Sequence, residues 1–342
     1  MSGMRIAQVE LKTSLIAFLC ILYIPGQTIA SEGAKFNLPK RLQHNVRKYF
    51  VGSSVKIAAI RVEFPEDQEE GTTGNGRFDL SDTDTLQFDP PPHNKRYFKA
   101  HINALSNYYA NISHGSVEID TGSSKLFPEG EEDSYQLANP MRYYSPKIDE
   151  ATDDNRLALL FFESVTAAAP DVDYNAYDCV AIFHAGVGKD FTFQLDLTPF
   201  DIPSAYLDSD FLRDNLSAEE YSQLRSLGVE RGLILAETQT QEGFNIALNG
   251  TFALLFGSFL GIPSLWDTDT GNPGIGKWGL MDQGSNNMDG AVPARPSAFT
   301  RMFMGWENPV SIRSGSGLQL FAFSDLITDS MYFSYKIPIS SN

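Results

Sequence analysis

The pattern of hydrophobic and polar positions divides the chain into strand-like and helix-like segments. Residues 55–64 form an apolar, β-rich run that predicts the first core strand, and residues 177–183 and 232–238 predict two more. Apolar side chains recur at helical spacing over residues 97–110, which predicts an amphipathic helix. Residues 149–168 predict a second helix, because acidic residues at its start suit the positive end of a helix dipole. The chain of 342 residues is long enough for one large domain.

Turn and capping signals lie between these segments. Residues 65–92 are acidic and rich in Gly and Pro, which predicts a long loop. Ser217 and Glu220 have the Ser-x-x-Glu spacing of a capping box, so we expect a short helix over residues 217–227. Residues 245–260 predict a further helix, and it is apolar enough that we expect it to be buried.

This last helix has the spacing of a zinc-peptidase motif without the zinc ligands. In that motif two histidines one turn apart bind zinc, a glutamate after the first histidine activates water, and a glycine ends the helix before a third ligand. The glycine is present as Gly261. The other four positions are Leu254, Leu255, Ser258 and Ser264. None of them supports zinc catalysis, because leucine has no donor atom and a neutral serine hydroxyl is a poor zinc ligand.

Segments after the helix follow one another in an order that is typical of a known family. A Gly-Ile-Pro-Ser-Leu-Trp-Asp turn at residues 261–267 precedes Gly-Lys-Trp-Gly-Leu-Met-Asp at residues 276–282, and Met-Gly-Trp-Glu-Asn-Pro-Val follows at residues 304–310. This order resembles the immune-inhibitor-A-like family of secreted bacterial metallopeptidases. In that family a Leu-Pro-Asp-Leu-Tyr-Asp turn and a Gly-x-Trp-x-Leu-Met-Asp segment follow the zinc helix. Upstream segments extend the resemblance over about residues 57–310.

The resemblance implies a zincin- or metzincin-like peptidase fold of the α/β (α+β) type. Such a fold has a twisted mixed sheet, a backing helix, the degenerate active-site helix, a Met-turn and a β-rich C-terminal tail. Met281 falls at the Met-turn, and His184 falls in a His-Ala-Gly segment that active relatives carry apart from the zinc site, so we expect structural roles for both. The peptidase-like domain is expected over residues 55–310. Residues 311–342 are expected to form the β-rich tail, as the start of a truncated C-terminal domain.

The substituted ligand positions predict a catalytically inactive homologue, a pseudopeptidase that binds no zinc. Its expected role is structural or the binding of an extended peptide or protein, because an edge strand beside the former cleft can accept a peptide through backbone hydrogen bonds. The alternative is an active metal-dependent endopeptidase with non-standard ligands. The candidate ligands are His184, Glu237, Glu242 and Asp282.

Aspartates on the Gly-rich turns after the helix are candidate calcium ligands. Asp267, Asp269 and Asp282 offer hard oxygen donors, which Ca²⁺ prefers. The alternative is that these side chains cap turns by accepting hydrogen bonds from backbone amides.

The first 30 residues have the pattern of a secretory signal peptide. Arg5 and Lys12 flank a short apolar core at residues 14–25, and Ala30 is a small residue that suits cleavage. The core is too short for a comfortable membrane span, although an N-terminal anchor is an alternative. Residues 31–54 are expected to form a linker or pro-like arm. The mature protein is therefore expected to be secreted or periplasmic, with no membrane contact after cleavage.

Charge and cysteine content narrow the functional classes further. The formal net charge of −17 argues against nucleic acid as a partner. Cleavage would leave Cys179 as the only cysteine, so no disulfide within the mature chain is expected. Its apolar surroundings predict a buried thiol rather than a nucleophile. The sequence leaves the oligomeric state open.

Overall fold

The computed structural model describes most of the chain between residues 54 and 312. The described residues are 34–36, 54–82, 87–193, 196–241, 243–267, 270–312 and 334–337. The predicted signal peptide over residues 1–30 lies outside them, as do most of the predicted linker over residues 31–54 and most of the predicted tail over residues 311–342.

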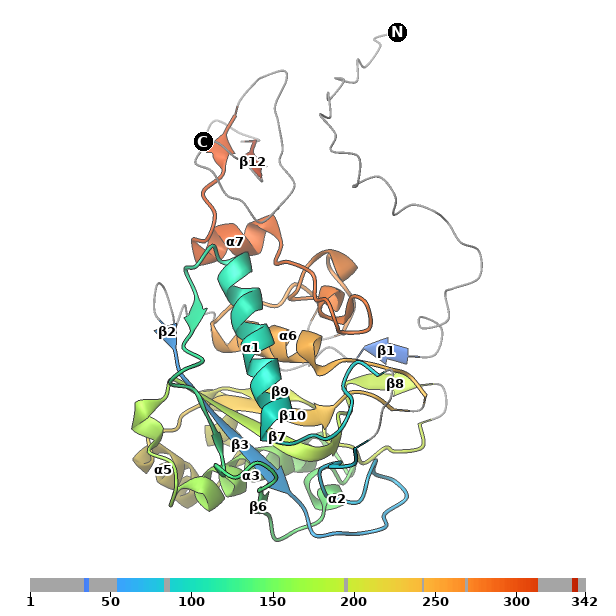
Figure 1. The fold of residues 1–342 in the computed structure, drawn as a ribbon. Helices are drawn as coiled ribbons and strands as arrows, with labels where there is room; N and C mark the ends of the chain where they lie inside the picture. Colours follow the sequence, from blue (N-terminus) through green and yellow to red (C-terminus); the bar gives the residue numbers. More distant parts are fainter. Residues whose placement is uncertain are drawn as a thin grey trace.

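A mixed β-sheet forms the centre of the fold (Figure 1). Its strand order is β5-β3-β7-β10-β9, and β6 also pairs with β3. The strands are β3 (Ile57–Glu63), β5 (Lys125–Phe127), β6 (Tyr135–Gln136), β7 (Cys179–Val187), β9 (Ala205–Leu207) and β10 (Gly232–Thr238). Strand β9 runs antiparallel to β10 at one end of the sheet, whereas the other pairings are parallel. The three predicted core strands are confirmed as β3, β7 and β10.

Helices cover both faces of this sheet, and Figure 1 shows α1 and α6 on one face and α3 on the other. The long helices are α1 (Lys95–Ile112), α3 (Glu150–Ala168) and α6 (Leu248–Phe259). The shorter ones are α2 (Met141–Tyr144), α4 (Ser209–Asn215), α5 (Ala218–Ser226) and α7 (Ala298–Met304), with 3-10 turns at η1 (Tyr174–Ala176), η2 (Gly276–Trp278) and η3 (Gln283–Asn286). Because both faces are covered, β3, β7 and β10 are buried along their whole lengths. The fold class is α/β, as expected.

Short strand pairs lie outside the main sheet. They are β1 (Ala34–Phe36) with β8 (Phe191–Phe193), β2 (Ser54–Val55) with β4 (Glu118–Ile119), and β11 (Val310–Ser311) with β12 (Tyr335–Lys336). The last pair is parallel and is the described part of the predicted β-rich tail. Among the described residues, no helix combines the length and the apolar character that a membrane crossing requires.

Side-chain caps fix the starts of the predicted helices. Asn94 and Asp149 accept backbone hydrogen bonds at the starts of α1 and α3. The predicted capping box of α5 is confirmed: the Ser217 hydroxyl accepts from the Glu220 amide, and the Glu220 carboxylate accepts from the Ser217 amide. These caps satisfy amides that have no partner within the helix.

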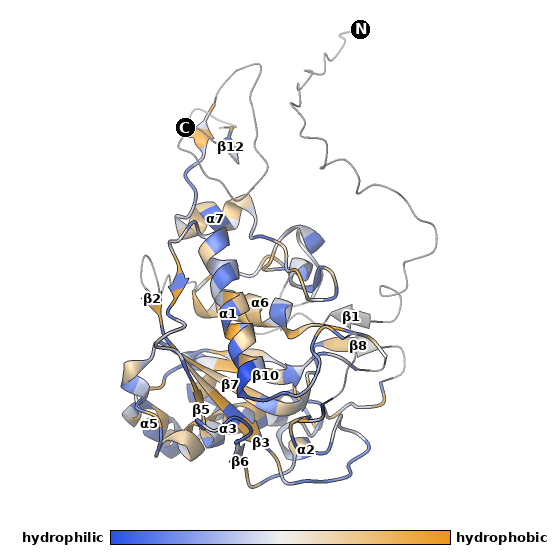
Figure 2. Ribbon diagram, viewed as in Figure 1, coloured by the Kyte–Doolittle hydropathy of each residue, from blue (hydrophilic) through white to orange (hydrophobic). Residues whose placement is uncertain are grey.

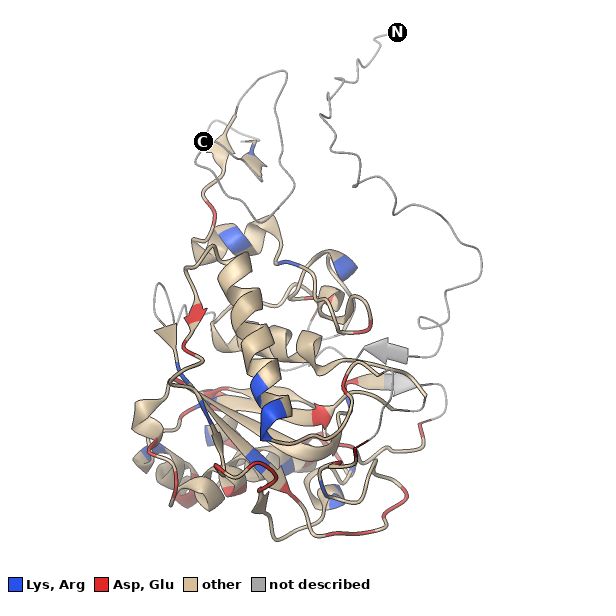
Figure 3. Cartoon of the chain, in the orientation of Figure 1, with Lys and Arg blue, Asp and Glu red and all other residues tan. Residues whose placement is uncertain are grey.

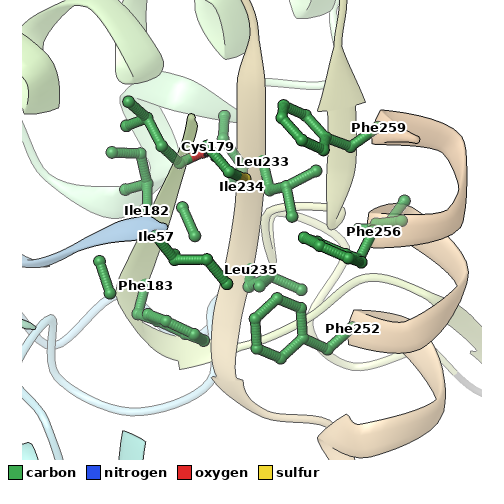
Figure 4. Packing of buried hydrophobic residues seen from close by; sticks show 14 of the residues in the cluster. Ile57, Cys179, Ile182, Phe183, Leu233, Ile234, Leu235, Phe252, Phe256 and Phe259 are labelled. Atoms are coloured by element: carbon green, nitrogen blue, oxygen red, sulfur yellow. Dashed lines mark hydrogen bonds between the residues drawn. The ribbon is translucent and has the colours of Figure 1, made fainter. Parts of the chain in front are cut away.

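Helix α6 is anchored to the sheet by three phenylalanines. Phe252, Phe256 and Phe259 point from α6 toward the central strands, as Figure 4 shows, and each is at most 1% exposed. The ring of Phe183 on β7 meets that of Phe252 edge-on, with centroids 5.6 Å apart. Burying each phenylalanine contributes about 1.5–3 kcal/mol. Figure 2 shows the same hydrophobic character along the strands and α6, so this contact is a principal part of the core.

The opposite face of α6 lies directly against residues 281–290. A Cβ atom on Gly250 would be 1.9 Å from the Ser285 carbonyl oxygen, and one on Gly257 would be 2.8 Å from the Met281 Sδ. Both approaches require glycine, although glycine inside a helix costs about 1 kcal/mol relative to alanine. Helix α6 is therefore enclosed between the sheet and this segment, which explains why all its residues except Asn249 are buried.

Gly261 ends α6, as the sequence predicts. Its φ of 83° is a left-handed conformation that glycine adopts without strain. The Gly261 amide donates to the Ser258 carbonyl, and the Ile262 amide donates to the Gly257 carbonyl, both at 2.9 Å. This pair of hydrogen bonds is a Schellman motif, which satisfies the last carbonyls of the helix and turns the chain away.

Candidate functional site

The positions of the zinc motif lie in or next to the core. Leu254 and Ser258 are one turn apart on α6 and are 1% and 7% exposed, and Leu255 is 1% exposed. The Ser258 hydroxyl donates to the Leu254 carbonyl at 3.3 Å, a local bond that uses its proton. Ser264 follows the helix and is half-buried. Three of the four positions are thus shielded from solvent, and none carries a strong zinc-binding group.

Met281 packs against α6 from the side opposite to the sheet. Its side chain is fully buried and its Sδ lies next to Gly257. The Met281 carbonyl accepts a hydrogen bond from the Leu265 amide at 2.9 Å. This bond connects the turn at residues 261–267 to the segment at residues 276–282. Both segments contribute to the predicted family resemblance.

His184 lies on the other side of the sheet. Side chains alternate along a strand, and its neighbour Phe183 faces α1 and α6. The His184 ring packs against Phe64, with centroids 6.1 Å apart, and its Nδ1 lies 2.9 Å from the Ala185 carbonyl oxygen. Burial lowers the pKa of His184 to about 4, so the imidazole is neutral at physiological pH. These contacts are those of a structural histidine.

Two of the three predicted calcium ligands lie in the described residues, and both accept hydrogen bonds from backbone amides. Asp282 is fully buried, and its Oδ2 accepts hydrogen bonds from the amides of Gly274, Ile275 and Gly276 at 2.7–2.9 Å. Asp267 is exposed and accepts from the amide three residues later at 3.1 Å. Both sets of bonds are those of the turn-capping alternative. Asp269 lies outside the described residues.

Two residues of the alternative ligand set for an active enzyme lie on opposite sides of the sheet. Glu237 is on β10 and faces α1, whereas His184 faces the other side of the sheet. Glu242 lies outside the described residues. Within the part of the chain that the structure describes, no three His, Cys, Asp or Glu side chains are arranged to hold one metal ion.

A cluster of buried polar side chains lies where the carboxyl end of β10 meets the start of α1. The Tyr97 ring lies between two imidazoles, with centroids 4.4 Å from His93 and 4.6 Å from His101. His93 Nδ1 is 3.5 Å from Glu237 Oε2, and His101 Nε2 is 3.7 Å from Asp89 Oδ1. The two histidines and two carboxylates are each less than 10% exposed. We refer to these five residues as the His–carboxylate cluster.

Asp89 also closes the start of α6. The residue at the N-cap position, Ala247, makes no side-chain cap. Asp89 Oδ2 instead accepts a hydrogen bond from the Leu248 amide at 2.7 Å, across 159 residues of sequence. The Thr238 hydroxyl lies 3.4 Å from the same oxygen. A carboxylate is favoured here by both the free amide and the helix dipole. Asp89 therefore connects the loop after β3 with β10 and α6.

The cluster has perturbed acid–base properties. Burial raises the pKa of Asp89 and of Glu237, because each charged carboxylate loses hydration, and the facing histidine offsets only part of this effect. Burial disfavours protonation of His93, but hydrogen bonding and attraction to Glu237 and the Asp89 carbonyl outweigh it, so the pKa of His93 is raised. Buried ionisable groups with perturbed pKa values often mark functional sites.

A pocket of about 500 Å³ opens onto the cluster. Its wall includes Asp89, His93 and Glu237, and the loop after β3 contributes Arg77 and Asp79. Figure 3 shows several acidic residues along this loop. Ligands of α/β folds commonly bind at the carboxyl ends of parallel strands, and β7 and β10 both end at this pocket. It is therefore a candidate binding site.

Sequence reasoning did not identify this cluster. The available signal was the spacing of four between Tyr97 and His101, which places both on one face of α1, whereas Asp89 and His93 lie in the loop before the helix. Nothing in the sequence pairs these residues with Glu237, because that contact forms only when β10 reaches the start of α1.

No protein-family model matches the sequence, and no curated protein matches it. The resemblance to immune-inhibitor-A-like peptidases therefore stays a prediction from the segments at residues 261–267, 276–282 and 304–310 and from the upstream segments.

Proposed function

We propose that this protein is a secreted, catalytically inactive relative of the zincin-type peptidases that binds an extended peptide. The observation that carries the proposal is the state of α6. The helix has the glycine of the zinc motif at its end, but leucines and a serine stand at the ligand and glutamate positions. Leu254, Leu255 and Ser258 are enclosed there by the protein.

The surroundings of α6 support a zincin-like fold. A mixed sheet lies on one side of α6, and α1 covers the same face of the sheet, as a backing helix would. Met281 packs beneath α6, which is the place that the resemblance gives to the Met-turn. Gly261 turns the chain at the end of the helix. Leucine side chains in place of ligands fill space and remove polar groups, which favours packing over catalysis.

The proposed peptide site is the outer edge of β9. This strand is the last in the sheet, and none of the described strands pairs with its outer side. An extended peptide can add to such an edge through main-chain hydrogen bonds, and side-chain pockets then give specificity. Tyr206 of β9 packs on Phe259 of α6, with centroids 6.3 Å apart, so a peptide on this edge would run beside the degenerate helix.

The first test is the metal content and peptidase activity of the purified mature protein. We expect substoichiometric zinc and no cleavage of casein or of quenched fluorescent peptides, with or without added zinc. Calcium in the same sample would identify a bound Ca²⁺ ion. Stoichiometric zinc together with cleavage that a chelator abolishes would overturn the proposal in favour of an active endopeptidase.

The second test addresses the edge strand through the ligand rather than the protein. Peptides selected from a library are resynthesised with alternate amides N-methylated, in the two possible registers. One register should weaken binding by at least about tenfold, because several main-chain hydrogen bonds of about 1 kcal/mol each are lost. The other register is the matched control, since its methyl groups point away from β9. Equal effects of both registers would refute edge-strand binding.

A further inference from the structure

We propose that the pocket beside the His–carboxylate cluster binds an organic cation, either a primary ammonium or a guanidinium group. The proposal goes beyond peptide binding at β9, since the cation can belong to a basic side chain of a peptide or to a free small amine. It follows from the hydrogen-bond geometry of His93, the charge balance of the pocket and the position of Asp79.

The hydrogen bonds of His93 leave one of its nitrogens without a donor or acceptor partner. Its Nε2 lies 3.2 Å from the Asp89 backbone oxygen, and a carbonyl can only accept, so Nε2 carries the hydrogen. Nδ1 of the neutral ring is then a lone pair. It faces Glu237 Oε2 at 3.5 Å and has no hydrogen-bond partner in the described structure, although His93 is only 4% exposed. In the neutral form of His93 two acceptors therefore face one another. The donor between them is supplied either by a proton on Nδ1 or by a cationic ligand.

The charges around the pocket are also unbalanced. Asp79, Asp89 and Glu237 contribute three carboxylates to its lining. Arg77 is the cation in the lining, but its guanidinium is held 2.7 Å from the carboxylate of Glu63, which lies outside the pocket. A cation that enters the pocket would supply a donor to neutral His93 Nδ1 and a positive charge next to the carboxylates. An anionic ligand would instead meet a lining that is already negative.

The arrangement of the carboxylates suits a ligand whose cationic end enters the pocket first. Asp79 is exposed, whereas Asp89 and Glu237 are buried further in. The Asp79 amide donates to Glu237 Oε2 at 3.3 Å, so the backbone of Asp79 lies next to the inner carboxylate. Phe78 and Val187 add apolar surface for the alkyl chain of a lysine, an arginine or a polyamine. A volume of about 500 Å³ is within the range of small-molecule sites.

The test uses the full mature protein and isothermal titration calorimetry. The probes are agmatine, which is a free guanidinium compound, and a pair of peptides that differ only by arginine or its neutral isostere citrulline. The variants are Asp79→Asn at the exposed entrance, Glu237→Gln inside, and Glu219→Gln as an exposed control on α5. Asp79→Asn keeps the test valid if Glu237→Gln fails to fold. Circular dichroism checks the fold of each variant.

We expect a guanidinium probe to bind the wild-type protein, with about tenfold loss in Glu237→Gln, a smaller loss in Asp79→Asn and no change in Glu219→Gln. Binding of agmatine alone would identify a free amine as the source. Preference for the arginine peptide over the citrulline peptide would identify a basic side chain.

Three results would overturn the inference. One is the absence of binding by both agmatine and the arginine peptide. Another is binding of either probe that Asp79→Asn and folded Glu237→Gln leave unchanged. Equal binding of the arginine and citrulline peptides, without binding of agmatine, would also reject the cation site. That last outcome would leave peptide binding at β9 intact, so the two proposals can fail separately.

Discussion

The side chain of Asp89 serves both the fold and the candidate site. Replacing Asp89 with alanine removes the acceptor of the Leu248 amide at the start of α6. A hydrogen bond to a charged group contributes about 1.5–3 kcal/mol, and the buried amide would be left unsatisfied. A buried carboxylate loses hydration, and this desolvation cost raises the pKa of Asp89. Removal of the carboxylate relieves the same cost. We expect a net destabilisation of about 2 kcal/mol.

The asparagine variant separates the hydrogen bond from the charge. Asp89→Asn keeps an amide oxygen that can accept from Leu248, and it no longer buries a charge. Its expected cost is therefore below about 1 kcal/mol, clearly less than that of Asp89→Ala. His101 loses its facing carboxylate in both variants, so this effect cancels in the comparison.

The assay is urea unfolding, followed by circular dichroism and tryptophan fluorescence, with the slope m compared among variants. Glu219→Ala, on the exposed side of α5, is the control and should change the free energy of unfolding by less than about 0.5 kcal/mol. A cost for Asp89→Ala as small as that of the control would show that Asp89 does not anchor α6. Equal costs for alanine and asparagine would show that the charge, rather than the hydrogen bond, is what matters.

Further predictions concern a buried glycine and the ionisation of a buried carboxyl and a buried thiol. Gly257→Ala should destabilise by about 1–3 kcal/mol in urea unfolding despite the better helix propensity of alanine, because the new Cβ lies 2.8 Å from Met281 Sδ; an unchanged or higher stability would contradict this contact. Burial raises the pKa of Asp201 from 3.8 to about 6, so its protonated form stabilises the fold. Wild type should therefore lose up to about 3 kcal/mol relative to Asp201→Asn as the pH rises from about 4 to 6, and a constant difference would refute the shift. Burial also raises the pKa of Cys179, so mass-spectrometric mapping should find it labelled by iodoacetamide only after unfolding, and native labelling would contradict its burial.

Much of the fold could be predicted because its signals are local. The apolar runs of β3, β7 and β10 and the helical spacing of α1 are properties of neighbouring residues, and the capping box of α5 spans only four positions. The end of α6 followed from Gly261, since glycine adopts the left-handed turn that stops a helix. The absence of zinc ligands on α6 could also be predicted from local sequence, because side chains one turn apart on a helix share a face.

The candidate site could be predicted only in part. Sequence reasoning located α6 and its substituted positions, and it placed Asp282 on a turn with turn capping as one of two alternatives. It treated the histidines singly and did not connect His93 with Glu237. The antiparallel position of β9 was also beyond it, because a three-residue strand carries too little periodicity to define its partner.

The sequence by itself therefore determined which segments form strands and helices, where α6 ends and which side chains are unable to bind zinc there. These properties depend on residues within one or two turns of one another. The tertiary structure decided which distant groups meet: Asp89 with the Leu248 amide across 159 residues, Glu237 with His93, and Met281 with Gly257. Such contacts follow from the packing of α1 and α6 on one face of the sheet, and burial then shifts the pKa values and leaves Nδ1 of His93 without a hydrogen-bond partner in the described structure. Local sequence patterns do not predict that packing, because the packing depends on how all the elements fit together.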